Sequence, residues 1–206
     1  MITMKKILVT GFDPYGKNND NPACRVLEII DGKEFHGYKI DTLKVPTVYY
    51  RSIEKTVEKI EEIKPEAVIC VGMSNRKKIS VERVGINFND ARIPDNDEQQ
   101  PKDELIDEDG ETAYFSTLPV REIYDRLIEE GIPAHISNTA GTFVCNHLMY
   151  GVLNHIYKDE LDIKAGFIHV PMMPEQTLDK DKPSMCLDLT AKAVEIAVET
   201  TIEHLE

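Results

Sequence analysis

Cys145 is the side chain of this sequence that is best placed to act as a nucleophile. It follows a small, polar stretch and opens an apolar pattern of helical spacing, which predicts a helix that runs to about Tyr157. Thr139 or Thr142 can cap the start of this helix. Free N–H groups and the positive end of the helix dipole favour a thiolate there, and the same N–H groups can stabilise an oxyanion. The alternative is a cysteine that packs as a small hydrophobic side chain under a core helix.

Catalysis by a cysteine also needs a base beside the thiol and a third group that orients the base. His169 stands near the end of an apolar run, residues 165–170, that predicts a buried strand. In a parallel sheet, the loop after one strand and the carboxyl end of its neighbour meet at the same edge, so Cys145 and His169 can lie close together. The alternative is that His169 is a buried, hydrogen-bonded histidine of the core.

The other candidates for the base and its orienting group are less well placed or too numerous to choose between. His147 lies two residues beyond Cys145 along the helix, so it points away from the thiol. His135 at a strand start and His155 deeper in the helix fit less well. Many carboxylates could orient the base. The pattern alone does not select Glu82, which by itself is typical of a solvated strand face.

Strands and helices alternate along the chain and must bring these side chains together. The predicted strands cover residues 6–10, 38–45, 67–72, 79–89, 134–137 and 165–170, and the predicted helices cover residues 23–30, 48–63, 117–130, 144–157 and 185–205. This alternation predicts one α/β domain over residues 1–206: a three-layer α/β/α sandwich with a mostly parallel central sheet. Asn21 as a cap and Pro22 support the first helix, and Cys70 falls in the most apolar strand, where it is expected to belong to the core.

Two loops of this arrangement could contribute to a binding site. Phe12 and Tyr15 follow the first strand, where they either pack on the core or form a flat apolar slot for a ring-shaped ligand. No GxGxxG follows this strand, so it is not a dinucleotide fingerprint. The acidic segment 95–111 lacks the spacing of an EF-hand and is expected to be irregular surface, although a segment this long can also cover a site.

The composition restricts the class of protein and its partners. A net charge of −13 argues against a nucleic-acid partner, because binding phosphates needs a basic face. No apolar run approaches the roughly 20 residues of a membrane helix, so no membrane partner is expected. The cysteines at 24, 70, 145 and 186 form neither a disulfide framework nor a CxxC metal site, which favours a reducing cytoplasm and predicts no metal or cofactor.

Five sets of residues, spread in order over nearly the whole chain, together carry a further signal. They are residues 8–16 with 21–22, 81–87, 90–96, 138–146, and 166–171 with 174–176. Together they resemble the pyroglutamyl peptidase I family of cysteine peptidases. The stretches around Cys145 and His169 are the specific ones, whereas the first set alone would be weak.

This resemblance implies roles for individual residues. Its triad would be Cys145, His169 and Glu82, and Arg92 would form the oxyanion hole with the backbone amide of Cys145. Phe12 and Tyr15 would sandwich the ring of the substrate, Asn21 would help to shape the ring pocket, and main-chain groups around Met73 would bond the lactam. The resemblance also implies a single α/β/α domain that assembles as a homotetramer in the cytoplasm.

The reaction implied is that of an omega peptidase, a thiol exopeptidase that acts on peptides or proteins with an N-terminal pyroglutamyl residue. The thiol would attack the carbonyl after the ring, and an acyl-enzyme would then be hydrolysed to free pyroglutamate. Two departures from the family pattern are visible: Tyr15 stands where Phe is usual, and the turn from Met73 to Arg76 is shorter. The added hydroxyl needs a partner, and the shorter turn affects the expected lactam contacts.

Two other functions remain open at the level of the sequence. A nucleoside-phosphorylase-like enzyme can have an α/β/α domain of this kind, but it would need a phosphate site, and the chain has no P-loop or comparable glycine-rich cradle. A non-catalytic module that binds a lactam or peptide would retain the ring pocket without turnover. Dependence of activity on a thiol or on phosphate separates these possibilities.

Overall fold

The computed structural model describes residues 4–16 and 19–205. Its strands are β1 (Lys5–Phe12), β2 (Glu34–Phe35), β3 (Tyr38–Val45), β4 (Ala67–Met73), β5 (Ile79–Glu82), β6 (Val84–Ile86), β7 (Ala113–Phe115), β8 (Ala134–Ser137) and β9 (Lys164–Val170). Its helices are α1 (Pro22–Ile30), α2 (Arg51–Ile63), α3 (Val120–Glu129), α4 (Val144–Lys158) and α5 (Leu187–Glu203), with a 3-10 turn at Pro174–Gln176.

A seven-stranded sheet with the order β2-β3-β1-β4-β9-β5-β8 forms the centre of the molecule. Strands β3, β1, β4 and β9 are parallel to one another, and β5 is parallel to β8. The pairings of β2 with β3 and of β5 with β9 are antiparallel. The mostly parallel α/β fold expected from the sequence is therefore confirmed, and β9 lies inside the sheet between β4 and β5.

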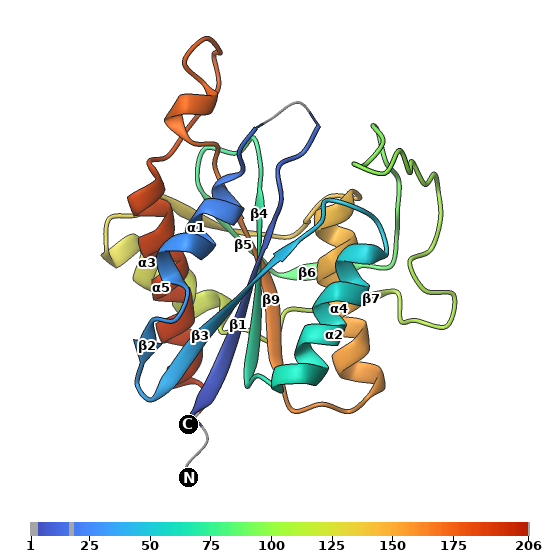
Figure 1. Cartoon of the computed structure of the whole chain (residues 1–206), viewed down its shortest axis with the longest axis horizontal. Helices are drawn as coiled ribbons and strands as arrows, with labels where there is room; N and C mark the ends of the chain where they lie inside the picture. The colour runs from blue at the N-terminus through green and yellow to red at the C-terminus, as the bar shows by residue number, and fades with distance from the viewer. Residues whose placement is uncertain (1–3, 17–18, 206) are drawn as a thin grey trace.

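Helices cover both faces of this sheet (Figure 1): α1, α3 and α5 lie on one side, and α2 and α4 lie on the other. Each face has its own apolar core. The apolar stripe of the Cys145 helix faces inward as its spacing predicted, with Val144, Leu148, Met149, Val152 and Ile156 buried. Three layers around two cores make the predicted sandwich.

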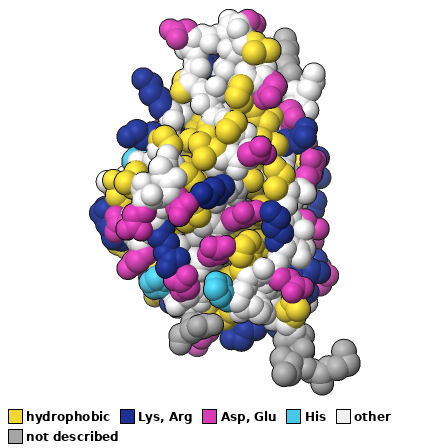
Figure 2. All heavy atoms as spheres, turned by 90° about the vertical axis from the view of Figure 1, so that its left-hand side faces the viewer, with side chains coloured by type: hydrophobic (Ala, Val, Ile, Leu, Met, Phe, Trp, Pro, Cys, Tyr) yellow, Lys and Arg dark blue, Asp and Glu magenta, His cyan; other side chains and the backbone are white. Residues whose placement is uncertain are grey.

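The outer face of the α1–α3–α5 layer is mixed in charge. Figure 2 shows acidic and basic side chains interspersed on this side of the molecule, with hydrophobic side chains between them. Arg126 pairs with Glu203, and Lys192 pairs with Glu130 at 2.5 Å, so that α3 and α5 are linked by ion pairs. None of the helices in the described ranges has the length and apolar character that crossing a membrane requires.

Local sequence signals explain where several helices begin and end. The side chain of Asn21 accepts a hydrogen bond of 3.0 Å from the N–H of Ala23, and Pro22 occupies the first turn of α1, as predicted. The predicted start of α2 at residue 48 was early, because Tyr50 adopts a positive φ of 59° directly before the helix. Lys64 ends α2 in the left-handed conformation, just before Pro65.

The prediction of one strand over residues 79–89 was wrong in its extent. The chain leaves the large sheet after Glu82, and β6 pairs instead with β7 in a separate two-stranded sheet. This second sheet lies against α4, where a Cβ at Gly85 would be 3.1 Å from the backbone nitrogen of Tyr150. The side chain of Asn146 bonds the N–H and C=O of Ile86 at 3.0 and 2.9 Å, which ties β6 to the first turn of α4.

Candidate active site

Glu82 and His169 form a buried pair at the boundary between the parallel strands and the antiparallel β5. Nδ1 of His169 lies 2.8 Å from Oε1 of Glu82. The carboxylate is fully buried, and His169 is 4% exposed. Because a carboxylate can only accept, Nδ1 carries the proton of this bond. The second ring nitrogen, Nε2, is then the one that can act as a base.

Cys145 occupies the first turn of α4 and lies over β4 beside the strand of His169. A Cβ built on Gly72 would be 3.0 Å from Sγ of Cys145 and 2.7 Å from the ring of Phe167. Gly72 is directly opposite His169 in the pairing of β4 with β9, and the rings of Phe167 and His169 are 4.8 Å apart. The thiol therefore uses space that a side chain at position 72 would fill, next to the histidine.

The route by which these groups meet differs from the one that we expected. Cys145 follows β8, but β5 stands between β8 and β9, and both β5 and β8 run opposite to β9. In the strand pairings, Ser137 at the end of β8 lies opposite Glu82. Glu82 in turn lies opposite Phe167, in the middle part of β9. The loop at residues 138–143 must therefore return from the middle of the sheet to place Cys145.

The start of α4 is not capped by a threonine, so that expectation was wrong. The N-cap residue is Phe143, without a side-chain capping bond. The hydroxyl of Thr139 accepts from the N–H of Gly141 at 3.1 Å, and the hydroxyl of Thr142 donates to the carbonyl of Asp90 at 2.9 Å. These bonds shape the loop and attach it to the segment around Asp90, and they leave the first-turn N–H groups of α4 uncapped by side chains.

Burial also works against a resting thiolate at Cys145. It raises the pKa of the thiol to about 12, and the negative charge of Glu82 acts in the same direction, whereas the guanidinium of Arg76 lowers this pKa. The expectation that the helix start alone favours the thiolate is thus opposed by desolvation. A neutral thiol in this position needs a base to take its proton when it attacks.

Arg76 is a residue of this site to which the sequence analysis gave no role. Its Nη1 lies 2.7 Å from Oε1 of Glu82 and 2.9 Å from the hydroxyl of Ser137, and its Nη2 donates to the carbonyl of Thr139 at 2.8 Å. One available signal was physical: a carboxylate expected to sit deep in a site needs a compensating charge. The basic run that contains Arg76 directly precedes β5.

Phe12 is the last residue of β1 and Tyr15 follows it in the next loop, and the two pack against different rings. Phe12 is 2% exposed, and its ring centroid is 6.4 Å from that of Phe167. Tyr15 is half-buried and meets Phe143 edge to face at 5.5 Å. Its hydroxyl has the partner that the extra oxygen required, because it donates to the carbonyl of Pro94 at 2.6 Å. Phe143, next to the cysteine helix, is an aromatic neighbour that sequence reasoning missed.

The remaining predicted residues lie around the same edge. Arg92 is exposed, two residues beyond Asp90, whose N–H donates to the carbonyl of Thr142 at 3.1 Å. Asn21 is buried, and its amide group donates to the carbonyl of Asp13 at 3.0 Å, so it supports the loop that carries Tyr15. Met73 is half-buried at the end of β4, opposite Val170. No described contact joins these three side chains to Cys145.

His147 has structural partners, and His135 lies on β8. His147 is fully buried, its Nε2 accepts from the N–H of Tyr50 at 2.7 Å, and its Nδ1 is 3.1 Å from the amide oxygen of Asn89. Burial lowers the pKa of His147 to about 3, so it stays neutral and holds the strained Tyr50 backbone. His135 is half-buried on β8, where burial and the charge of Arg76 lower its pKa.

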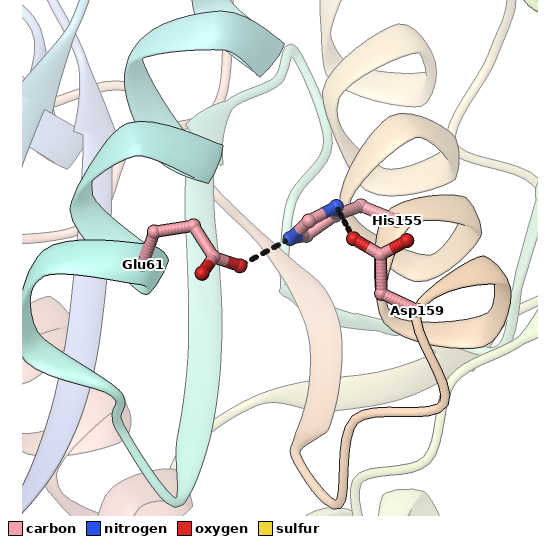
Figure 3. A group of neighbouring side chains, drawn as sticks. All are labelled: Glu61, His155 and Asp159. Atoms are coloured by element: carbon pink, nitrogen blue, oxygen red, sulfur yellow. Dashed lines mark hydrogen bonds and ion pairs between the residues drawn. The ribbon is translucent and has the colours of Figure 1, made fainter.

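One group in the described part of the chain has the composition of a metal site: Glu61, His155 and Asp159. It lies at the far end of α4, roughly 15 Å or more from Cys145 at 1.5 Å per helical residue. Figure 3 shows the imidazole between the two carboxylates, with Nε2 3.1 Å from Glu61 and Nδ1 3.1 Å from Asp159. Each ring nitrogen already has its own carboxylate, so this group acts as a polar link between α2 and α4.

Comparison with known proteins gives one consistent result. A family model described as pyroglutamyl peptidase matches residues 5–204. A pyrrolidone-carboxylate peptidase of Thermoanaerobacter sp. (strain X514) is 54% identical over 195 residues, which cover 94% of this chain and 96% of that protein. A pyrrolidone-carboxylate peptidase of Brevibacillus brevis is 48% identical over 203 residues, which cover 98% of this chain and 94% of that protein.

Solved structures agree with the sequence relatives. The chain resembles the crystal structure of pyroglutamyl peptidase I from Bacillus amyloliquefaciens with a TM-score of 0.95 and 44% identity, covering 98% of each chain. It also resembles a mutant pyrrolidone carboxyl peptidase from Pyrococcus furiosus with a TM-score of 0.95 and 40% identity, covering 98% of this chain and 100% of that one.

Proposed function

Since the chain belongs to the pyroglutamyl peptidase family and is a cysteine peptidase that removes pyroglutamyl residues, we propose that Cys145, His169 and Glu82 are its catalytic triad. The observation that carries this proposal is the buried 2.8 Å bond between Nδ1 of His169 and Glu82, beside a cysteine that opens a helix. This pair fixes the imidazole so that Nε2 is free to act as the base.

The reaction begins with a protonated thiol, because burial holds the pKa of Cys145 near 12. Nε2 of His169 takes the thiol proton as sulfur attacks the carbonyl carbon that follows the pyroglutamyl ring. When the tetrahedral intermediate collapses, the same proton goes to the leaving amine, and a thioester remains. His169 then takes a proton from water, whose oxygen attacks the thioester and releases pyroglutamate and the thiol.

We assign the oxyanion hole to the backbone N–H of Cys145 and the side chain of Arg92. The N–H belongs to the first turn of α4, where the helix leaves N–H groups without internal partners. Arg92 comes from a segment that is attached to the loop before Cys145 by two hydrogen bonds between Asp90 and Thr142. An exposed guanidinium on this segment can turn toward the developing charge when substrate binds.

Recognition of the ring is assigned to Phe12, Tyr15, Asn21 and the main chain at Met73. A lactam is neutral, so its binding depends on aromatic faces and a few directed hydrogen bonds instead of an ion pair. Tyr15 offers its face from a loop that Asn21 supports through Asp13. Met73 ends β4, one residue beyond the glycine under the thiol, so its peptide groups lie near the reacting carbonyl.

Assembly, location and domain extent are further parts of the proposal. Residues 1–206 would act as one catalytic domain, and the protein would form a homotetramer in the cytoplasm. Four free cysteines suit a reducing compartment. Large hydrophobic side chains available for contacts between subunits include Phe115 and Tyr157, which line a groove of about 740 Å³ and are 71% and 60% exposed. Light scattering on the eluting protein measures the mass of the assembly.

The test is release of a fluorescent amine from a pyroglutamyl amide, with a prolyl amide as the control substrate. We expect selective turnover that iodoacetamide abolishes, and we expect Cys145→Ala to lose at least about 10⁴-fold in kcat, as for removal of a catalytic nucleophile. Its melting temperature should stay close to that of the parent. Full activity of folded Cys145→Ala, or equal turnover of the prolyl amide, would contradict the assignment.

A further inference from the structure

Arg76 connects two parts of the site that are far apart in the sequence. Its guanidinium contacts Glu82 on β5 at 2.7 Å, and it contacts the hydroxyl of Ser137 and the carbonyl of Thr139 at 2.9 and 2.8 Å. Ser137 and Thr139 begin the loop that leads to Cys145. A planar fork with donors on two sides is suited to holding such groups at a fixed spacing, which a lysine cannot reproduce.

The same guanidinium supplies the positive charge that a buried carboxylate such as Glu82 needs beside it. Glu82 is fully buried, and its Oε1 receives both the bond from Arg76 and the bond from His169. Its Oε2 has no hydrogen-bond partner among the described residues. A buried carboxylate whose partner is only a neutral imidazole would be strongly destabilised. The permanent positive charge of Arg76 compensates this buried carboxylate, and its bond to Oε1 holds that oxygen beside Nδ1 of His169.

We propose that Arg76 is a positioning residue of the catalytic site, which fixes the Glu82–His169 pair and sets its spacing from the loop of Cys145. This inference rests on the proposed triad. Arg76 does not need to touch substrate for this role. It acts on the reaction through the orientation of His169, through the place of the thiol, and through the local charge.

The charge effect has a defined direction. The groups near the thiol and imidazole are Glu82, which raises the thiol pKa, Arg76, which lowers it, and the second buried thiol at Cys70, which raises it. On the far side of Arg76, β8 contributes His135, and Lys78 precedes β5. Replacing Arg76 by a neutral residue removes the charge that lowers the pKa of the Cys145 thiol, so the thiol holds its proton to higher pH.

The experiment compares Arg76→Gln, Arg76→Lys and the matched control Arg83→Gln. Arg83 bonds the same loop, because its Nη1 donates to the side chain of Asn138 at 2.9 Å, but it is not bonded to Glu82. For each protein we would measure the pH profile of kcat/KM, the melting temperature, and the rate of alkylation of Cys145 by iodoacetamide against pH. Peptide mass spectrometry separates Cys145 from the other three cysteines.

Arg76→Gln is expected to lower kcat/KM by about 10- to 100-fold, as for a misplaced catalytic group. It is also expected to slow the alkylation of Cys145 about tenfold at a given pH between 7 and 9. The thiol pKa lies above this range, so a rise of about one unit leaves about a tenth of the thiolate. Arg76→Lys keeps the charge and loses the fork, so its Cys145 should be alkylated at nearly the parent rate while kcat/KM still falls. Arg83→Gln should match the parent in both measurements.

A purely structural role would lower the melting temperature and the folded fraction but would not change the alkylation rate of Cys145 in the folded protein. The proposal is therefore overturned if the alkylation and activity profiles of folded Arg76→Gln superimpose on those of the parent. If Arg76→Gln does not fold, an Arg76→Lys protein with the kcat of the parent overturns it. Inactivity of the parent toward the pyroglutamyl amide would count against the proposed function instead, and the alkylation arm would still decide the role of Arg76.

Discussion

In the proposed triad the two nitrogens of His169 have different tasks, and this difference can be tested at a single atom. Nδ1 donates to Glu82, which selects the tautomer that leaves Nε2 for the thiol. Glu82→Gln can offer either an oxygen or an NH₂ group to Nδ1, so the tautomer is no longer fixed. We expect kcat to fall by about 10²- to 10⁴-fold. A stopped assay of pyroglutamyl amide cleavage at several pH values measures this.

Glu82→Gln needs a control for folding, because Arg76 loses its ionised partner in the same variant. The melting temperature and near-ultraviolet circular dichroism of the variant should remain those of a folded protein. If a folded Glu82→Gln protein keeps the parent kcat across the pH range, Glu82 does not orient the base.

The hydroxyl of Tyr15 is a second feature of single-atom size. It donates to the carbonyl of Pro94 at 2.6 Å and so holds the aromatic loop against the segment that carries Arg92. Tyr15→Phe keeps the ring and removes this bond, so we expect KM to rise about 2- to 10-fold, the equivalent of one hydrogen bond, with kcat little changed. Initial rates over a range of substrate concentrations separate the two constants. A fall in kcat at unchanged KM would contradict this role.

His147 gives the protein a predictable sensitivity to acid. Its pKa is lowered from 6.5 to about 3 by burial in the folded state, so the unfolded chain binds the proton first as pH falls. The stability from this residue is therefore present above pH 6.5 and is lost as pH falls from there toward 3. Between pH 7 and pH 5 we expect a loss of about 2 kcal/mol in the free energy of unfolding.

Urea unfolding at several pH values measures the contribution of His147. The control is His147→Gln, whose side-chain oxygen can still accept from the N–H of Tyr50 but does not titrate. The free energy of unfolding of this variant should change less between pH 7 and pH 5 than that of the parent. Parallel curves for parent and variant would show that the acid sensitivity comes from other groups.

At the scale of elements, the close approach of α4 to β4 depends on a position without a side chain. A Cβ at Gly72 would lie 3.0 Å from the sulfur of Cys145 and 2.7 Å from the Phe167 ring. Gly72→Ala should displace the thiol, lower kcat by about 10²-fold and reduce the free energy of unfolding by about 1–3 kcal/mol through overpacking. Gly151→Ala is a matched control, since the three atoms nearest to its new Cβ all belong to the side chain of Ile53, the first at 2.2 Å.

Both glycine variants are expected to lose stability, but only Gly72→Ala should lose kcat. Denaturant unfolding and pyroglutamyl amide turnover on the same preparations give the comparison. If Gly151→Ala loses as much kcat as Gly72→Ala, the effect is one of general packing and not of thiol placement.

Most elements were predictable because their apolar spacing is regular, and the misses have local physical causes. Strand β3 at 38–45 and strand β8 at 134–137 have the expected bounds. The break after Glu82 was missed although the apolar alternation changes phase there, from Ile79 and Val81 to Val84 and Ile86. Alternation alone does not reveal which sheet a strand joins. The threonines near Cys145 suggested a cap, but their hydroxyls are used within the loop and on Asp90.

The pairings within the candidate site were less accessible to sequence reasoning. Cysteine at a helix start and histidine at a strand end have recognisable local patterns, but Glu82 was identified only through resemblance. Arg76 was missed because its partners, Ser137 and Thr139, lie about 60 residues away in the chain. The order of β9, β5 and β8 brings them together, and local spacing cannot reveal that order.

For the whole molecule, the excess of acidic groups sets the response to salt. The net charge is −13, and ion pairs such as Lys192–Glu130 are exposed, so they contribute little. Salt should therefore weaken the repulsion among the acidic side chains more than it weakens the attraction within the exposed ion pairs. We expect the melting temperature to rise when NaCl increases from 10 to 150 mM, as the Debye length falls from about 30 to about 8 Å. A melting temperature that falls over this range would contradict this balance.

The position of β9 has a consequence for the folding of the chain during its synthesis. This strand is the last of the sheet to leave the ribosome, yet it lies between β4 and β5, which are synthesised well before it. A nascent chain can hold Glu82 and Cys145 but cannot close its sheet until residues 164–170 enter the middle. His169 arrives on that same strand. Closure of the sheet and the first appearance of the proposed base beside the thiol are therefore one event, so a chain that has not yet added β9 also lacks this base.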